Sequence, residues 1–488
     1  MDRPQNGPDP KGDRPDDNSQ PSAYDEFEAF QARQRRLILL TAITANLFGN
    51  IGLIGINVAL PSITREMDLS PVRMNWVTLS TMLFMAMFSS PIARIADLIG
   101  RRRIAIFGLW TTVIASAGCA VSQGFWILLL FRALTGLGLV SFFTTVTTMV
   151  TAAYPLKERG RVLGLTISSV YIGLTMGPIV AGVIVEHLGW QSLFWFTVVG
   201  MIPTMILIHQ VRPETMATAS GEKLDWLGAI LWIIAVALMF SGLASLGQSK
   251  GWIPLAAGLI LMVFFVRVSL GSKNPVLDMR LFLDSRRFSF SSLAAYISYF
   301  SSTSVSFLLS LYLQYSRHLS PAQAGLFLVA QPVVQASLTP LSGRLSDRYD
   351  AGRLASAGMT IIMATIIIFA TNIGVDTPTI LLIATMALTG AGFAFFSAPN
   401  TNAIMSAVSR ERLGQASGVI TVTRLFGQIS SIALITIVFN YVIGPGSITE
   451  NKYPAFITAS RICFLIFAPL CLTGILASLA RGKSERVE

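Results

Sequence analysis

A short motif with one arginine and one aspartate occurs twice along the chain. Arg94-Ile-Ala-Asp97 reappears 250 residues later as Arg344-Leu-Ser-Asp347. A carboxylate at a helix end can accept hydrogen bonds from the amino terminus of a neighbouring helix and from arginine. Such a group can hold one packing arrangement of two helices, so the role we expect for Asp97 and Asp347 is conformational rather than catalytic.

The repeat extends beyond this motif. Three further matches occur in the same order, at offsets of 250 and then 254: Leu69-Ser-Pro71 with Leu319-Ser-Pro321, Ala133–Gly138 with Ala387–Gly392, and Gly160-x-x-x-Gly164 with Gly414-x-x-x-Gly418. Ordered matches with so little drift predict two homologous halves. In a membrane chain, duplicated halves are typical of secondary transporters, which place their substrate at the interface between the repeats.

Enzymatic chemistry finds little support. Arg481-Gly-Lys-Ser484 ends like a phosphate-binding loop, but Ala477 stands where that loop requires glycine, and no strand precedes it. The three cysteines, Cys119, Cys463 and Cys471, lie in apolar stretches without metal-ligand spacing, so we interpret them as packing residues and expect no disulfide. We therefore expect that the protein is not an enzyme and that it binds no cofactor and no metal.

Composition identifies the elements that must position these residues. The chain is 53% hydrophobic and 12% charged, with a mean hydropathy of +0.63, which is outside the range of soluble domains. A membrane span needs about 20 mostly apolar residues, and windows of that length predict an all-α membrane protein. About fourteen spans are expected, near 37–61, 74–93, 103–122, 125–151, 160–185, 190–210, 226–246, 251–271, 288–313, 322–343, 353–372, 377–402, 414–440 and 457–480.

The positive charges predict the orientation. The net charge of +11 would suggest a nucleic-acid partner in a soluble protein. Here, however, the basic residues are concentrated in the loops on one side of the membrane. With a cytoplasmic amino terminus, only eight basic residues lie off the cytoplasmic side: Arg65, Arg73, Lys250, Arg317 and Lys452 outside, and Arg132, Arg424 and Arg461 within spans. This asymmetry follows the positive-inside rule. We expect a multi-pass protein of a bacterial-type inner (plasma) membrane, with both termini cytoplasmic and no nucleic-acid partner.

The repeat also predicts the domain organisation. Residues 1–36 begin with a polar, proline-rich and acidic stretch, so they are predicted to form a disordered cytoplasmic tail. Residues 37–211 and 288–480 form the two six-helix halves. The stretch 212–287 matches neither half and is predicted to be a linker with two extra spans, and 481–488 a second cytoplasmic tail. We expect a monomer.

Several motifs resemble those of the major facilitator superfamily. Residues 93–103 resemble the loop signature between its second and third helices: Asp97, Gly100, Arg101 and Arg102 match, while Ala93 replaces a glycine and Leu98 an arginine. The second copy, Gly343 to Asp347 and Arg348, keeps the features that the first has lost. The resemblance implies a major facilitator fold in which these residues control gating.

Three other segments extend this resemblance. Arg132, followed by Gly136 and Gly138, resembles the fourth-helix motif; because a charge within a span is expensive, Arg132 should face a cavity or a polar partner. Gly173, Gly177, Pro178 and Gly182 resemble the fifth-helix motif associated with antiporters. Small residues at this spacing allow close helix packing and the proline permits a bend. Asn57-Val-Ala-Leu-Pro61 and the two extra spans resemble the fourteen-span drug:proton antiporter branch.

One departure from that branch bears on coupling. The branch signature has an aspartate five residues before Asn57, where this chain has Gly52. The 25 acids all fall in tails, loops or span ends, and the three histidines do likewise. Proton carriers in membranes normally use a buried Asp, Glu or His. Proton coupling is therefore doubtful, and Asp97 at a helix end is the leading candidate if it exists.

Polar and cationic residues remain as candidates for a substrate cavity. Asn46, Asn50 and Asn57 share one helical face within about 40°, and the resemblance implies that the first helix of each half lines the cavity; polar contacts between helices are the alternative. Arg424 lies near the middle of its span. The other candidates are Arg132, Tyr296, Tyr299, Gln331, Gln335, Asn400, Asn402 and Gln428. Aromatic, amide and arginine groups suit an amphipathic or anionic organic molecule.

The sequence thus predicts a secondary active transporter that works by alternating access between two halves. We favour an exporter of amphipathic or anionic organic compounds, resembling multidrug efflux proteins. A uniporter or importer of a specific metabolite without proton coupling is the main alternative, favoured by the missing acid. A membrane sensor or scaffold that does not transport is a remote one.

Overall fold

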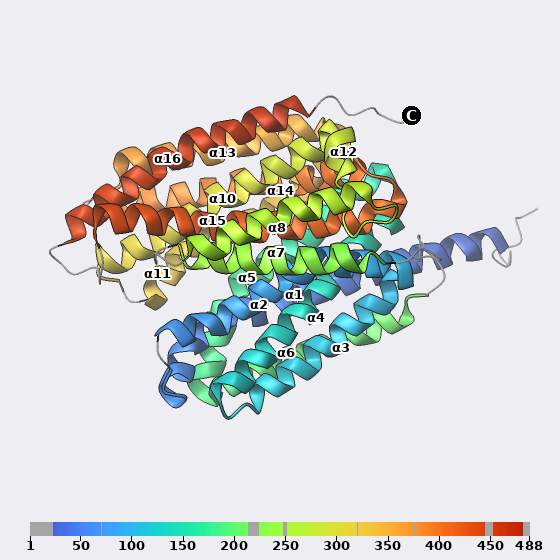
Figure 1. Ribbon diagram of the computed structural model, residues 1–488, viewed down its shortest axis with the longest axis horizontal. Helices are drawn as coiled ribbons and strands as arrows, with labels where there is room; N and C mark the ends of the chain where they lie inside the picture. The colour runs from blue at the N-terminus through green and yellow to red at the C-terminus, as the bar shows by residue number, and fades with distance from the viewer. Residues whose placement is uncertain are drawn as a thin grey trace, which may run out of the picture.

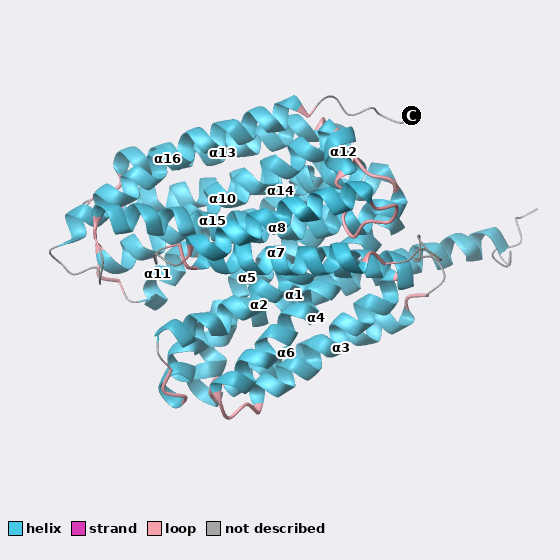
Figure 2. Ribbon diagram, in the orientation of Figure 1, coloured by secondary structure: helices cyan, strands magenta, loops and turns pink. Residues whose placement is uncertain are grey.

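The computed structural model describes residues 23–69, 71–212, 224–246, 251–319, 321–374, 377–444 and 452–481. These residues form helices and short connections, with no strand among them (Figure 2). The first helix begins at Ala23, so the tail that we expected to be disordered through residue 36 is helical from residue 23. All five prolines of this region precede residue 22, and the stretch after them is rich in good helix formers. Residues 1–22 lie outside the described residues.

The helices follow one another along the whole chain and run side by side in a bundle (Figure 1). Their bounds are α1 Ala23–Glu66, α2 Pro71–Ile99, α3 Arg101–Ala120, α4 Phe125–Ala153, α5 Leu156–Leu188, α6 Gln191–Gln210, α7 Trp226–Ala244, α8 Trp252–Gly271, α9 Arg280–Asp284, α10 Arg286–Tyr315, α11 Pro321–Leu328, α12 Ala330–Arg348, α13 Ala351–Asn372, α14 Thr379–Ser406, the 3-10 helix Arg410–Arg412, α15 Leu413–Val442 and α16 Tyr453–Ala480.

Thirteen helical segments among the described residues are long and apolar enough to cross a membrane. The remaining predicted span, 288–313, corresponds to α10, a 30-residue helix whose many serines lower its hydropathy. The predicted span 322–343 is divided into α11 and α12, with the break after Leu328. Pro332 explains the break, because its ring clashes with the carbonyl group four residues earlier, which is that of Leu328.

The bundle is built from two groups of helices and an inserted pair. Within α1–α6, α1 packs on α5 and α3 on α4; within α10–α16, α13 packs on α14 and α16, and α10 on α15. The two groups meet mainly through α5 with α12 and α2 with α15. The inserted hairpin α7–α8 contacts α2 and α15 through α7, and Figure 1 shows it crossing the middle of the view between the two groups.

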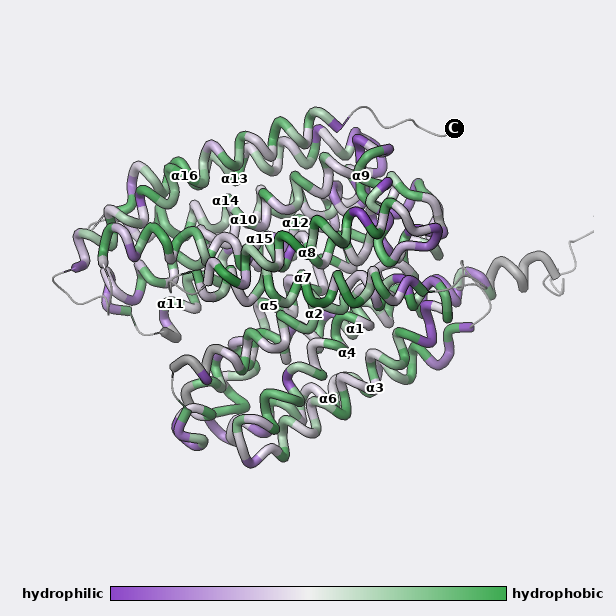
Figure 3. Tube along the Cα trace, viewed as in Figure 1, coloured by the Kyte–Doolittle hydropathy of each residue, from purple (hydrophilic) through white to green (hydrophobic). Residues whose placement is uncertain are grey.

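Hydrophilic residues gather at the ends of the bundle, and hydrophobic residues run along the helices between them (Figure 3). One end, which we call the basic end, carries Arg101, Arg102, Arg103, Arg348 and Arg353, where α3 and α13 begin and α12 stops. Figure 1 shows the two groups of helices close together at this end and diverging toward the turn between α1 and α2.

Candidate functional site

At the basic end, Asp347 of the C-terminal group contacts α5 of the N-terminal group. Its carboxylate accepts hydrogen bonds from the backbone N–H groups of Gly160, at 2.7 Å, and Arg161, at 2.9 Å. Both distances are in the range of charge-assisted bonds. A carboxylate at the end of one helix is thus held by the backbone of a helix from the other half.

Asp97 occupies the corresponding position in the N-terminal group. Its side chain is fully buried, and one carboxylate oxygen accepts from Nε and Nη2 of Arg101 at 3.1 and 3.0 Å. The carboxylate also faces Gly414 at the start of α15, leaving no room there for a Cβ atom. The repeat therefore crosses over, since the aspartate of each half meets the glycine of the other.

Glycines make this approach possible. A Cβ atom at Gly343 would overlap the carbonyl oxygen of Gly160, and one at Gly164 would lie 2.9 Å from the carbonyl oxygen of Thr339. Further along the same seam, the Ser168 hydroxyl donates to the carbonyl of Ala336 at 2.6 Å. The helices α5 and α12 are consequently in backbone contact at the basic end.

The other residues of the loop signature have different surroundings. Arg102 donates to the carbonyls of Ile208 and His209 at 3.1 and 3.0 Å, so it caps α6 within its own half rather than joining Asp97. Gly100 has a φ of 113°, a backbone conformation that favours glycine, at the turn between α2 and α3. Ala93 packs against Gly418 of α15, and Arg348 ends α12.

The fifth-helix motif lies against α1. A Cβ atom at Gly173 would lie 2.7 Å from the Leu47 carbonyl oxygen, whereas Gly177 has room for ordinary contact with Ile51. Pro178 lies within α5, and a Cβ atom at Gly182 would meet no neighbouring atom within 4 Å. Close packing of α1 on α5 therefore depends on the first glycine of the motif.

Two of the three asparagines of α1 take part in this packing. Asn46 donates to the Thr166 carbonyl of α5 at 3.3 Å, and Asn50 donates to the carbonyl of Asn46 at 2.7 Å. Both are buried, whereas Asn57 is exposed and accepts from Thr78 of α2 at 3.4 Å. Asn46 therefore makes a polar contact between α1 and α5, the alternative that the sequence left open, whereas the hydrogen bond of Asn50 stays within α1.

Gly52, which replaces the branch aspartate, faces α6. A Cβ atom there would lie 2.5 Å from the hydroxyl oxygen and 3.2 Å from the methyl carbon of Thr197. A side chain at this position therefore requires Thr197 or one of the two helices to move. The missing acid is thus accompanied by close packing of α1 on α6.

Arg132 is enclosed by its own half. Its side chain is 1% exposed, and Nε donates to the Val77 carbonyl of α2 at 3.0 Å. Nη2 is buried without a hydrogen-bond partner among the described residues. Arg132 therefore has the polar partner expected of a charge in a span, close to the end of α4 that is remote from the basic end.

The two candidate asparagines of the C-terminal half lie near the basic end, apart from the other candidates. Asn400 donates to the Ser291 carbonyl at 3.0 Å and accepts from Arg481 at 3.2 Å. Burial lowers the pKa of Arg481 to about 10, so the guanidinium stays charged at neutral pH. Asn402 donates to Ser346 at 3.4 Å, beside the Asp347 contact, and both asparagines are therefore closer to the basic end than to mid-depth.

Two more predicted residues lie between helices of the C-terminal half. Gln331 accepts from the Ser306 hydroxyl of α10 at 2.8 Å. Tyr296 stacks on Phe300 at a ring distance of 5.9 Å and lines a cavity beside α7 and α8.

Five side chains come together between the halves. Arg424 of α15 acts electrostatically on Tyr171 of α5 and Tyr299 of α10, whose hydroxyl groups interact directly. Gln335 of α12 is a further polar neighbour of Tyr171. The Phe393 ring of α14 lies 6.1 Å from that of Tyr171 and 5.3 Å from that of Tyr299. We call these five residues the Arg424 cluster.

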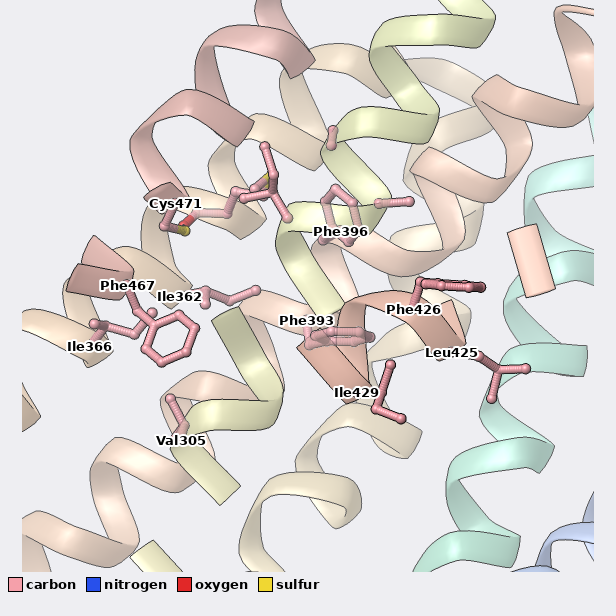
Figure 4. Packing of buried hydrophobic residues seen from close by; sticks show 14 of the residues in the cluster. Val305, Ile362, Ile366, Phe393, Phe396, Leu425, Phe426, Ile429, Phe467 and Cys471 are labelled. Atoms are coloured by element: carbon pink, nitrogen blue, oxygen red, sulfur yellow. The ribbon is translucent and has the colours of Figure 1, made fainter. Parts of the chain in front are cut away.

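The cluster lies at mid-depth, since Tyr171, Tyr299, Phe393 and Arg424 are close to the middle of their helices. Gln335 is close to the middle of the apolar segment Gln323–Arg348, which α11 and α12 form together. Gln428 follows Arg424 by one turn, on the face of α15 whose Ser417 donates to the Thr144 carbonyl of α4 at 2.8 Å. Figure 4 shows Phe393 with Phe426 and Ile429 in the hydrophobic packing beside the cluster. A cation, two phenols, an amide and an aromatic ring can together bind an aromatic or anionic group.

Tyr171 and Phe393 were not among the predicted site residues. The signal for Tyr171 was present, because Gly160, Gly164, Ser168 and Tyr171 follow one another on one helical face. The first three contact α12, so the fourth is directed to the same seam. Phe393 directly follows the repeated Ala387–Gly392 segment but has no comparable signal.

Comparison with known proteins agrees with this architecture. A model of the Major Facilitator Superfamily matches residues 38–276 and 291–487. The riboflavin transporter RibZ of Clostridioides difficile is 25% identical over 448 residues, 91% of this chain and 96% of the relative. The multidrug resistance protein Stp of Mycobacterium tuberculosis is 29% identical over 392 residues, 78% of this chain and 71% of the relative.

Among solved structures, the human organic anion transporter MFSD10 (TETRAN) has the same fold, with a TM-score of 0.64. The alignment covers 92% of this chain and 99% of that one at 13% identity. The family model, the helical architecture and the crossed repeat contacts lead to the same conclusion: this chain is a transporter of the major facilitator superfamily.

Proposed function

We propose that this transporter exports amphipathic or anionic organic compounds, with the Arg424 cluster as its central binding site. The main support is the composition of the cluster, which has one cation and three aromatic rings at mid-depth between the halves. The described acids all lie away from mid-depth, so the charge offered to a substrate is positive. The relative named as a multidrug resistance protein agrees with export.

Alternating access requires the basic end to open and close. Two Asp–Gly contacts join the halves at this end, and we infer that they keep it closed. We place this end on the cytoplasmic side of a bacterial-type cell membrane, as the positive-inside rule predicts. The structure would then be the conformation closed to the cytoplasm. Breaking both contacts would let the halves rock about the Arg424 cluster.

Binding of two matched compounds tests the central site. We would measure the affinities for 8-anilino-1-naphthalenesulfonate and for uncharged N-phenyl-1-naphthylamine, which share one aromatic skeleton. A hydrogen bond to a charged group contributes about 1.5–3 kcal/mol, so Arg424→Gln should weaken binding of the sulfonate by at least tenfold and that of the neutral compound by less than twofold.

Arg461→Gln is the matched control, because Arg461 also lies in a span but donates to the Ile373 carbonyl at 2.8 Å, away from the cluster. Equal losses for the two compounds in Arg424→Gln, or equal effects of the two variants, would refute the assignment. Counterflow in proteoliposomes with and without a pH gradient then tests transport and its direction.

A uniporter or importer of a specific metabolite without proton coupling is the second candidate. The close contact between Gly52 and Thr197 favours it, because an aspartate side chain at the branch position would clash with the Thr197 side chain as the helices are packed. The relative named as a riboflavin transporter agrees with a specific substrate. This candidate would be favoured over export if a pH gradient leaves transport unchanged and transport dissipates any substrate gradient.

A further inference from the structure

A cavity of about 620 Å³ lies between the inserted hairpin and the C-terminal half. Leu255 and Leu259 of α8 line its outer side, and residues of α10 and α15, including Phe426, line its inner side. Its volume is within the 300–1,000 Å³ typical of sites for drug-sized ligands. The cavity is separate from the Arg424 cluster, none of whose members lines it.

A hydroxyl group without a partner lies in the inner wall. Ser292 is only 5% exposed, lines the cavity, and its Oγ has no hydrogen-bond partner among the described residues. An unsatisfied buried hydroxyl is unfavourable. Neighbouring atoms cover this oxygen, so a ligand would bond to it after rotation of the Ser292 side chain, and the new hydrogen bond would offset part of the unfavourable burial. Tyr296 and Thr423 also line the wall.

The wall residues define the chemistry of the ligand. Most of them are aliphatic or aromatic, a few carry hydroxyl groups, and none is charged. Such a site suits an uncharged compound with an apolar body and one hydrogen-bonding group. A phospholipid headgroup would require charged partners, which this wall lacks.

The cavity and the Arg424 cluster lie on two sides of one helix crossing. At Gly427 of α15 a Cβ atom would lie 2.8 Å from the Tyr296 carbonyl oxygen and 2.9 Å from the Tyr299 Cβ. On α10, Tyr296 lines the cavity while Tyr299 belongs to the cluster. On α15, Thr423 lines the cavity while Arg424 belongs to the cluster. A ligand in the cavity is thus one helix crossing away from the central site.

The outer wall borders the lipid. Helix α8 packs chiefly on α7, and Ile253, Ile260, Val263 and Phe264 on its surface are exposed. We propose that the cavity is a second binding site, which takes uncharged amphipathic compounds from the bilayer. Its role as an entrance to the Arg424 cluster rests on the proposed function, whereas binding to the cavity does not.

Filling the cavity from its open side tests the proposal. Leu259→Trp adds bulk to the lining, and Ile260→Trp makes the same kind of change at the next residue, which is 59% exposed and outside the lining. The probe is tritiated N-phenyl-1-naphthylamine, bound to the protein in nanodiscs and measured by scintillation proximity with the empty-nanodisc signal subtracted. Leu259→Trp should weaken its binding by at least tenfold, and Ile260→Trp by less than twofold.

Ser292→Ala gives an independent readout. Because it removes an unsatisfied hydroxyl, it should leave the melting temperature unchanged or higher, while weakening binding of the neutral probe by about three- to tenfold. Unchanged affinity in both Leu259→Trp and Ser292→Ala would overturn the proposal. The proposal would also be overturned if the probe does not bind and native mass spectrometry finds a phospholipid on the wild type but not on Leu259→Trp.

The sulfonate compound separates this proposal from the proposed function. Leu259→Trp should leave binding of 8-anilino-1-naphthalenesulfonate within twofold of the wild type, because that anion is assigned to Arg424. If Arg424→Gln has no effect on the sulfonate while Leu259→Trp weakens the neutral probe, the central site is refuted and the lateral cavity stands. In proteoliposomes, the entrance role predicts that Leu259→Trp slows transport of the neutral compound only, and equal slowing of both would refute that role.

Discussion

A single methyl group at Gly343 should open the basic end. In Gly343→Ala the new Cβ would overlap the Gly160 carbonyl oxygen and lie 3.0 Å from its carbonyl carbon and 3.1 Å from the Gly164 Cα. These are backbone atoms of α5, which cannot move aside as a flexible side chain could. Ordinary van der Waals contact needs about 3.4–4 Å, so α12 must withdraw from α5 by roughly 1 Å.

The energetic effect follows from this displacement. Overpacking typically costs about 1–3 kcal/mol. A withdrawal of about 1 Å would also stretch the bonds of Asp347, now 2.7 and 2.9 Å long, beyond hydrogen-bond range. Since the cost falls only on conformations in which the basic end is closed, the equilibrium should shift toward opening by roughly 5- to 150-fold.

Distances between spin labels would measure the shift. Leu156 and Tyr349 are exposed on the two sides of the seam, and labelled cysteines at both positions report its opening. The matched control is Gly182→Ala, on the same α5 but with no atom within 4 Å of the new Cβ. Distances that stay as in the wild type in a folded Gly343→Ala protein, or that change equally in Gly182→Ala, would refute the reasoning.

Three other substitutions test the remaining contacts. Asp97→Asn should shift the same equilibrium and slow transport, because it removes the carboxylate charge that pairs with the buried Arg101. Unchanged cysteine accessibility and transport would contradict this. Gly52→Asp should lower the melting temperature and confer no proton coupling. Adding Thr197→Ala to this variant should restore stability by removing the clashing atoms. If Gly52→Asp alone is stable and shows proton-coupled flux, the packing argument is wrong. Arg132→Met should change affinities for the anionic and neutral naphthylamines equally, because the side chain is enclosed between helices of one half; a selective loss of anion binding would instead assign Arg132 to the substrate.

The sequence was sufficient for the architecture because its signals are local or repeated. Apolar windows of about 20 residues specify membrane helices whatever their neighbours are, and the offsets of 250 and 254 residues mark equivalent positions in the two halves. Pro332, visible in the sequence, divides α11 from α12 where the prediction had one continuous span. The predicted order and number of spans required no knowledge of which helices touch.

Tertiary structure alone decided the partners. Helical periodicity predicts that Asn46 and Asn50 share a face, but not that this face packs on α5 while Arg424 meets Tyr171. It also cannot show that Asp97 faces Gly414 and Asp347 meets Gly160, rather than each aspartate contacting the glycine of its own half. The physical reason is that a residue's position on a helix is determined by its neighbours in sequence, whereas its contacts depend on how separate helices pack, over distances of more than a hundred residues along the chain.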